Sequence, residues 1–166
     1  MPIKNKIQRG VTLIEAMIAL LVISVGLLGI ASLQITAMSQ NTSALNHNKA
    51  VWIAYTVSDR IRANLPAFAA YDGIDTNNTY IQDCETAPCN NADMVTADAA
   101  DWQNMLTDLP GGRGIIRFNA ANDGLLVDVM WDDEGTGATG TNCDPTDTND
   151  LTCYTLAVAL PLAVGP

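Results

Sequence analysis

Residues 10–33 read GVTLIEAMIALLVISVGLLGIASL, and the rest of the chain is organised around this stretch. Residues 16–33 contain no charged residue and no proline. Because an α-helix rises about 1.5 Å per residue, roughly twenty apolar residues span the hydrocarbon core of a bilayer. Residues 11–33 are therefore long enough and apolar enough to form a membrane-spanning helix.

The charged residues around this stretch predict its orientation. Lys4, Lys6 and Arg9 resist translocation, so the N-terminus should stay in the cytoplasm and the residues after the helix should lie outside. The stretch itself carries a single charge, Glu15. A carboxylate at the centre of a membrane helix costs about 2.5–3.5 kcal/mol, less near an end, and usually has a partner. Alternatively, Glu15 sits at the interface and interacts with the positive end of the helix.

A basic leader, a glycine, the residues T-L-I-E and an apolar run resemble, in this order, the class III signal of type IV prepilins. In that family a membrane peptidase cuts after the glycine and methylates the new N-terminal residue. The resemblance implies cleavage after Gly10 and N-methylation of Val11, where the family usually has phenylalanine. It also implies that Glu15, the fifth mature residue, attracts the N-terminal amine of a neighbouring subunit during filament assembly.

A second mode of processing is compatible with the same residues. Small residues at positions 29–31 would also suit an ordinary secretory signal that is cut after Ala31. That cut would release a soluble domain beginning at Ser32. N-terminal mass spectrometry distinguishes the two modes.

The length of 166 residues suits one soluble domain with an anchor. We expect a leader over residues 1–10 and a transmembrane or filament-core half of a long helix over residues 11–38. Residues 39–166 are expected to form an extracytoplasmic head domain. In the prepilin interpretation the chain crosses the inner membrane once and later reaches the pilus and the cell surface.

The charge of the chain disfavours nucleic acid as a partner. The formal net charge is −10, from 8 basic and 18 acidic residues. Three of the basic residues lie in the leader, so the mature chain has 5 against 18, a charge of −13. A protein of this charge is poorly suited to binding a phosphate backbone.

The four cysteines all follow the apolar stretch, as expected for an exported domain in an oxidising compartment. They allow three disulfide pairings. We favour the local pairing, Cys84–Cys89 and Cys143–Cys153, since both intervening loops are short and polar. A zinc site is the alternative, but the spacings are not those of zinc ligands and the one histidine, His47, lies far away in the sequence.

The helix that begins in the apolar stretch is expected to continue to about residue 65, before Pro66. No proline interrupts residues 12–64. Beyond residue 50, apolar residues recur every three or four positions, which is typical of a helix that packs on a core. The members of this stripe are Ala50, Ile53, Ala54, Val57, Ile61 and Leu65. Gly26 and Gly29 are either ordinary glycines of a membrane helix or a place where the helix unwinds locally in a filament.

The remainder predicts loops and a small sheet. Residues 66–101 show no sustained period, and residues 98–109 predict a short helix with Asp98 as its N-cap. Strands are expected over residues 114–118, 125–131 and 153–160, with a turn at residues 119–124 closing on Asn122, Asp123 and Gly124. The second of these strands alternates, which places Leu125, Val127, Val129 and Trp131 on one face. Three antiparallel strands with an apolar face can pack on the second half of the long helix. The fold class is therefore α+β, which the pilin resemblance also implies.

No residues in the chain suggest catalysis or a bound cofactor. The sequence has no phosphate-binding glycine loop, no G-x-S-x-G motif and no evident nucleophile–base pair. The acidic stretch of residues 132–150 could hold calcium, with Asp144 and Asp147 as the candidate ligands, but it has no D-x-D-x-D-G loop. A solvated acidic loop is the simpler interpretation, so we expect neither an enzyme nor a metal site.

Three later segments resemble minor pilins of the PilV kind. They are residues 52–64 (WIAYTVSDRIRAN), residues 109–112 (LPGG) and residues 129–132 (VMWD). The resemblance implies a minor pilin that primes pilus assembly and supports twitching motility and adhesion. Its partners would be other minor pilins, the major pilin, the prepilin peptidase, the inner-membrane assembly platform and membrane lipid. The alternatives are a minor pseudopilin of a type II secretion system, a pilus-tip adhesin and a DNA-binding competence pseudopilin, the last disfavoured by charge.

Overall fold

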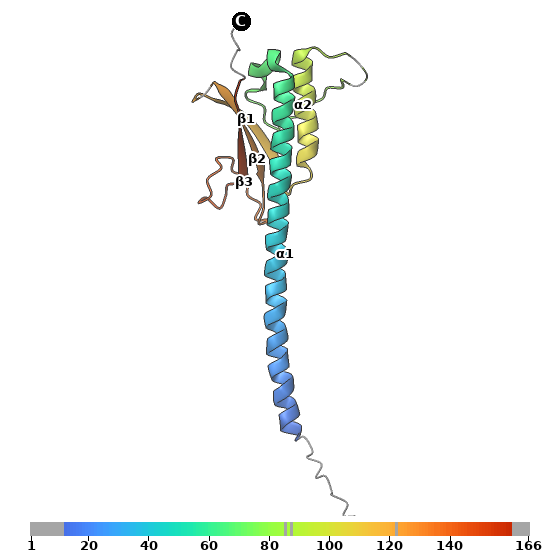
Figure 1. The fold of residues 1–166 in the computed structure, drawn as a ribbon, viewed down its shortest axis with the longest axis vertical. Helices are drawn as coiled ribbons and strands as arrows, with labels where there is room; N and C mark the ends of the chain where they lie inside the picture. The colour runs from blue at the N-terminus through green and yellow to red at the C-terminus, as the bar shows by residue number, and fades with distance from the viewer. Residues whose placement is uncertain (1–11, 85, 87, 122, 161–166) are drawn as a thin grey trace, which may run out of the picture. The chain divides into compact units, whose positions relative to one another are not determined.

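The computed structural model describes residues 12–84, 86, 88–121 and 123–160 (Figure 1). The described chain divides into two compact units, one that ends at Thr42 and one that begins at Ser43. The α+β class is confirmed: a long N-terminal helix is followed by a three-stranded antiparallel sheet. In chain order the elements are α1 (Leu13–Ala63), the 3₁₀ helix η1 (Leu65–Tyr71), α2 (Asn91–Leu106), β1 (Arg113–Asn119), β2 (Gly124–Trp131) and β3 (Thr152–Val158).

The first unit contains the apolar part of α1. Every described residue from 12 to 42 is exposed, including large apolar side chains such as Leu28 (71%) and Leu33 (72%). Three hydroxyl groups here donate hydrogen bonds to backbone carbonyl oxygens four residues earlier, from Ser24 at 2.7 Å and from Thr36 and Thr42 at 3.1 Å. Helical backbone and back-bonded hydroxyls leave few polar groups unsatisfied, which is what a lipid environment requires.

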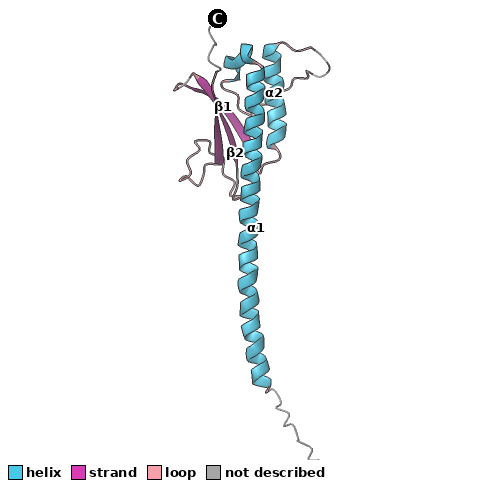
Figure 2. Cartoon of the chain, in the orientation of Figure 1, coloured by secondary structure: helices cyan, strands magenta, loops and turns pink. Residues whose placement is uncertain are grey.

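The second unit begins with the amphipathic part of α1, and α2 lies alongside it (Figure 2). Ala50, Ile53, Ala54, Val57 and Ile61 are buried in one core cluster, as predicted. Full burial of a valine or isoleucine side chain stabilises a fold by about 1.5–3 kcal/mol before entropy is counted. The same cluster includes residues of α2 and of all three strands, among them Trp102, Leu106, Ile116, Val127, Val129, Trp131 and Val158.

The end of α1 differs slightly from the prediction. Leu65 was expected in the buried stripe, but its side chain is 39% exposed. The helix ends at Ala63, and the chain turns at Asn64 into η1, which has a proline in its first turn. Leu65 therefore leaves the helical face, and Phe68 and Tyr71 of η1 are buried instead.

The prediction for residues 66–101 was wrong in two places. This segment contains nearly all of η1 and most of α2, and α2 begins at Asn91 rather than near Asp98. Asn90 is the N-cap: its side chain accepts hydrogen bonds from the backbone of Ala92 and Asp93, and the Asp93 carboxylate accepts one from the Asn90 backbone. This capping box satisfies amides that the first helical turn leaves unpaired. Asp98 lies inside the helix and is buried.

The sheet has the strand order β1-β2-β3, with both pairs antiparallel. Leu125, Val127, Val129 and Trp131 share one face of β2 and enter the core, as the alternation predicted. On the opposite face of β2, Asp128 and Met130 are fully buried as well. Asp128 is covered by contacts with Arg117 and Thr155, and its carboxylate lies within 4.8 Å of the sulfur atoms of the Cys143–Cys153 disulfide.

Gly114 allows β1 to approach α2 closely. A Cβ built on Gly114 would lie 2.2 Å from Cζ2 of Trp102, which is 1% exposed. No side chain larger than hydrogen fits there unless the indole moves. The indole Nε1 has no hydrogen-bond partner in the described part of the chain, so packing alone fixes the ring.

We expect Gly114→Ala to lower the free energy of unfolding by about 2 kcal/mol, because overpacking a rigid core typically costs 1–3 kcal/mol. Urea unfolding of the purified full chain in detergent, followed by tryptophan fluorescence, measures the change. Gly29→Ala is the control, since a Cβ there meets nothing within 4 Å. In a Trp102→Phe background the cost of Gly114→Ala should fall by at least half. Equal costs in both backgrounds would contradict the proposed clash.

Candidate functional site

Gly10 and Val11, where the prepilin signal places the cut, lie outside the described residues. Glu15 is described: it lies in the first turn of α1, and its backbone N–H donates to the carbonyl of Thr12 at 3.0 Å. The residue is exposed. A carboxylate in the first turn interacts favourably with the positive end of the helix, and an exposed one remains available to a cation from another chain. The position of Glu15 is therefore compatible with both of the roles considered for it.

The N-terminal part of α1 meets the length and composition of a membrane span. Within α1 an 18-residue window reaches a mean hydropathy of 2.5, and none of that window is buried. A secretory signal near an N-terminus would also meet these criteria. An apolar window with no cover from its own chain, together with the signal motif described below, indicates membrane anchoring.

The acidic loop between β2 and β3 forms a shallow hollow of about 380 Å³. Most of its carboxylates accept hydrogen bonds from backbone or side-chain groups of the same loop. Asp132 accepts hydrogen bonds from the backbone of Thr136 at 3.0 Å and Gly137 at 2.7 Å, and the pKa of Asp132 lies below its usual value mainly because of these bonds. The acidic residues that line the hollow are Asp132, Asp133, Glu134, Asp144, Asp147 and Asp150.

Asp144 and Asp147, the calcium candidates, are both in this loop. Asp144 accepts from the side chain and backbone of Thr146, at 2.7 and 2.8 Å, and these bonds lower the pKa of the Asp144 carboxyl. Asp147 accepts from the backbone and side chain of Asn149, at 2.9 and 3.0 Å. Both carboxylates thus stabilise tight turns, and the calcium alternative gains no geometric support from them.

Among the described residues, one group of three potential metal-ligand side chains lies close together: Asp128, Cys143 and Cys153. The two sulfur atoms are joined in a disulfide, so neither is a thiolate that could bind zinc. Asp128 is already paired with Arg117, at 2.8 Å from Nε and 2.6 Å from Nη2, and accepts from Thr155 Oγ1 at 2.6 Å. This cluster therefore has a structural role: the disulfide attaches the acidic loop to β3, and Asp128 is held by Arg117 and Thr155.

Asp133 ties the acidic loop to the start of the second unit. Its carboxylate accepts hydrogen bonds from Ser43 Oγ, from Asn46 Nδ2 at 3.2 Å and from Trp131 Nε1 at 3.0 Å. Burial opposes ionisation, but the three donors outweigh it and hold the pKa of Asp133 below its usual value. In the sequence Asp133 is only one member of a charge run, because no pattern there indicates a contact between residues 43 and 133.

The D-R-I-R-A-N segment at the end of α1 takes part in a second polar network that sequence reasoning missed. Arg60 donates to Asp98 at 2.9 Å and to Asp101 at 2.7 Å. Tyr71 donates to Asp98 at 2.5 Å and accepts from Asn64 at 3.3 Å. Burial and the bond to Asp98 raise the pKa of Tyr71 far above its usual value, so the phenol stays protonated. The network joins α1, η1 and α2.

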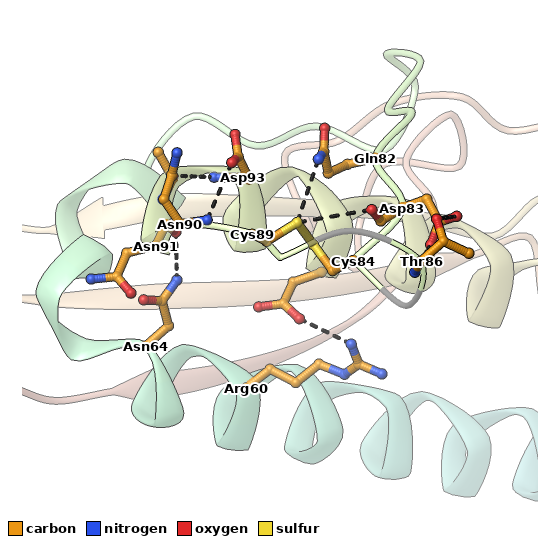
Figure 3. Close-up of a disulfide and its surroundings, with 12 residues drawn as sticks. Arg60, Asn64, Gln82, Asp83, Cys84, Thr86, Cys89, Asn90, Asn91 and Asp93 are labelled. Carbon is orange, nitrogen blue, oxygen red and sulfur yellow. Dashed lines mark hydrogen bonds and ion pairs between the residues drawn. A yellow bond between two sulfur atoms is a disulfide. The ribbon is translucent and has the colours of Figure 1, made fainter.

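The Cys84–Cys89 disulfide lies just before α2, near this network (Figure 3). Asn64 Nδ2 donates to the backbone carbonyl of Asn91 at 2.8 Å, which connects the end of α1 to the start of α2. Gln82 Nε2 lies 3.4 Å from the sulfur of Cys89. With Cys143–Cys153, the structure contains both of the local disulfides that the spacing favoured.

Comparison with protein-family models gives two matches on adjacent parts of the chain. Residues 5–31 match the prokaryotic N-terminal methylation motif. Residues 32–100 match the Tt1218-like model, described as type IV pilin Tt1218. The second match covers the later half of α1, η1 and most of α2, whereas the three strands lie beyond it.

No curated protein and no solved structure matches the chain. The family therefore rests on the two matched models and on the fold. A methylation signal leads directly into a long apolar helix, and the later part of that helix packs with an antiparallel sheet in one core. These features together show that the chain is a type IV pilin.

Proposed function

We propose that this pilin is a minor subunit of a type IV pilus, of the PilV kind, which joins other minor pilins in the inner membrane and primes filament assembly. The observation that carries the proposal is the contrast between the two parts of the chain. The first half of α1 offers an uncovered apolar surface to neighbouring helices. The remainder is strongly acidic, and many adjacent copies of it would repel one another.

The three segments of the chain correspond to the proposed steps of processing, membrane anchoring and assembly. Residues 1–10 keep the N-terminus in the cytoplasm until the prepilin peptidase cuts after Gly10 and Val11 becomes the N-methylated end. Residues 11–38 anchor the subunit in the inner membrane and later pack in the filament core. Residues 39–166 form the periplasmic head, which reaches the cell surface with the pilus, near its tip. The assembly platform and the major pilin are the partners in the last step.

Glu15 is proposed to select the position of the subunit in the filament. Its exposed carboxylate, in the first turn of α1, is available to the N-terminal amine of a neighbouring subunit. A pair of opposite charges interacts more strongly in an apolar filament core than in water, and an unpaired carboxylate there is costly. A subunit that enters without this pairing would leave the charge buried alone.

Cleavage after Gly10 is expected in cells that assemble type IV pili. Mass spectrometry of the purified mature protein should find an N-terminus of N-methylated Val11, because the leader, glycine and T-L-I-E run together form the signal. Gly10→Val is the matched variant and should leave the precursor uncut. A mature chain that starts at Ser32 would instead show an ordinary secretory signal and would refute the anchored subunit.

The role of Glu15 is tested by Glu15→Leu and Glu15→Gln. Both should be cleaved normally but should fall roughly tenfold in sheared filaments relative to membranes, since loss of about 1.4 kcal/mol is a tenfold change. Quantitative immunoblots of the two fractions give the ratio. Glu15→Asp, which keeps the charge, is the control and should retain a substantial part. Normal incorporation of the leucine variant would exclude the proposed pairing.

The cellular role is tested by deletion of the gene. Loss of surface pili and of twitching, with protein secretion unchanged, is the expected phenotype of a missing priming subunit. Electron microscopy, stab-agar motility and assay of secreted proteins measure the three traits, and plasmid complementation is the control. Loss of secretion with normal pili would assign the chain to a type II secretion system. Normal pili and secretion with reduced adherence would assign it to a tip adhesin.

A further inference from the structure

The two edges of the sheet, β1 and β3, differ in whether another segment of the described chain covers them. The outer edge of β1 is covered by residues 72–76, which run beside it. Ile116 donates to Ile74 at 2.9 Å and accepts from Gly73 at 3.0 Å. Thr76 makes two further bonds to Gly114, and Asp72 accepts from Phe118.

This cover fixes which backbone groups of β3 point outward. In an antiparallel sheet, successive residues of a strand direct their N–H and C=O groups to alternate sides. Residues 114, 116 and 118 of β1 face residues 72–76, so the intervening residues pair with β2. By the register of the strands, residues 125, 127, 129 and 131 of β2 then direct their N–H and C=O groups toward β3. On β3 the outward groups therefore belong to Cys153, Thr155 and Ala157.

None of these outward N–H and C=O groups has a partner within the described part of the chain. The loop before β3 pairs with Gly140 only as far as Leu151, whose N–H donates to the Gly140 carbonyl at 3.0 Å. Thr152, Thr155 and Ala157 are exposed. The open edge thus runs along residues 152–158, and we call this stretch the β3 edge.

The β3 edge also lacks the features that usually protect an exposed strand. Natural edge strands carry lysine or another charge, proline or a bulge, which prevent pairing with other chains. The sequence of residues 152–158 is TCYTLAV, with no charge and no proline. Its register with β2 runs without a bulge from Thr152 to Val158. An open edge of this kind is a template for an added strand.

We propose that the β3 edge binds an extended strand from another membrane-anchored subunit, a different chain rather than a second copy of this one. The acidic hollow lies at one end of this edge, since its lining includes Thr152 and Cys153. A strand that carries a basic residue at that end, and uncharged residues beside Thr155 and Ala157, fits both features. A second copy would bring another strongly acidic head to the same place.

Anchoring of both subunits in the same membrane explains how so short an edge can bind a partner strand. Three residues with outward backbone groups make few bonds, and each bond adds little net stability in water. Two subunits anchored side by side meet at a high effective concentration, so a weak contact is occupied. The identity of the partner as a neighbouring anchored subunit therefore rests on the proposed function, whereas the openness of the edge does not.

The openness of the edge is tested by hydrogen exchange on the purified full chain in detergent. The amides of Cys153, Thr155 and Ala157 should exchange at least tenfold faster than those of Tyr154 and Leu156, which pair with β2. NMR or high-resolution mass spectrometry resolves the alternation. Equal protection of all five amides would mean that the edge is already covered, and would overturn the proposal.

Ala157→Pro tests the partner in living cells. Proline removes an outward N–H but no bond to β2, so the sheet should persist. Ala157→Ser keeps the N–H and is the control. A photo-reactive benzophenone side chain at Thr152 should crosslink to an extended segment of another subunit, identified by mass spectrometry. The yield should fall at least fivefold with Ala157→Pro and stay unchanged with Ala157→Ser.

The other outcomes of this experiment overturn the proposal. Crosslinks to a second copy would assign the edge to self-association, and crosslinks within the same chain would assign it to an internal segment. An unchanged yield with Ala157→Pro would show that no strand is added. Failure of the minor-pilin role is separate: a gene deletion with normal pili would refute that role, while the amide pattern and the crosslink would remain as measured.

Discussion

The uncovered apolar surface of α1 is the constraint on which the rest of this molecule depends. Every described residue from 12 to 42 is exposed, and none of the apolar side chains among them is buried. A surface of this size is not stable in water, so the environment must cover it, either as lipid or as the helices of other subunits. Membrane anchoring and pilus assembly are two solutions to the same requirement, which explains why one helix can serve both in a type IV pilin.

The head domain is held by a moderate core and by polar networks at its boundaries. Ile53, Val57 and Ile61 of α1 share a cluster with Trp102 and Trp131, while Asp98 and Asp133 sit where elements meet. Each of these two carboxylates collects donors from more than one element, so it orients the elements as well as satisfying its own charge. The long acidic loop is likewise ordered by its own carboxylates, which accept from nearby backbone amides.

The parts of this structure that could be predicted from the sequence depend on patterns among residues that are close together in the chain. The apolar run, the stripe from Ala50 to Ile61 and the alternation of β2 are such patterns, and the structure confirms all three. The start of α2 was missed because its buried face is made partly of alanine and its cap is an ordinary asparagine. The contacts of Asp98 and Asp133 could not be predicted, since Asp98 bonds to Arg60, 38 positions away, and Asp133 bonds to Ser43, 90 positions away. The prepilin signal was recognisable because its residues are contiguous.

The order of elements along the chain has a consequence for how the second unit folds. The buried stripe of α1 emerges first, but the residues that complete its core lie on β2 and β3, and Ser43 meets Asp133 only 90 positions later. Long loops must close before these contacts are gained, so folding should be slow compared with that of a helical bundle. Until β3 has been added to the sheet, the amphipathic part of α1 is uncovered and open to premature association. The two disulfides span separations of only 5 and 10 residues, so their closure does not have to wait for the core. A chaperone or a neighbouring subunit would act in this interval, on a chain whose core is still incomplete.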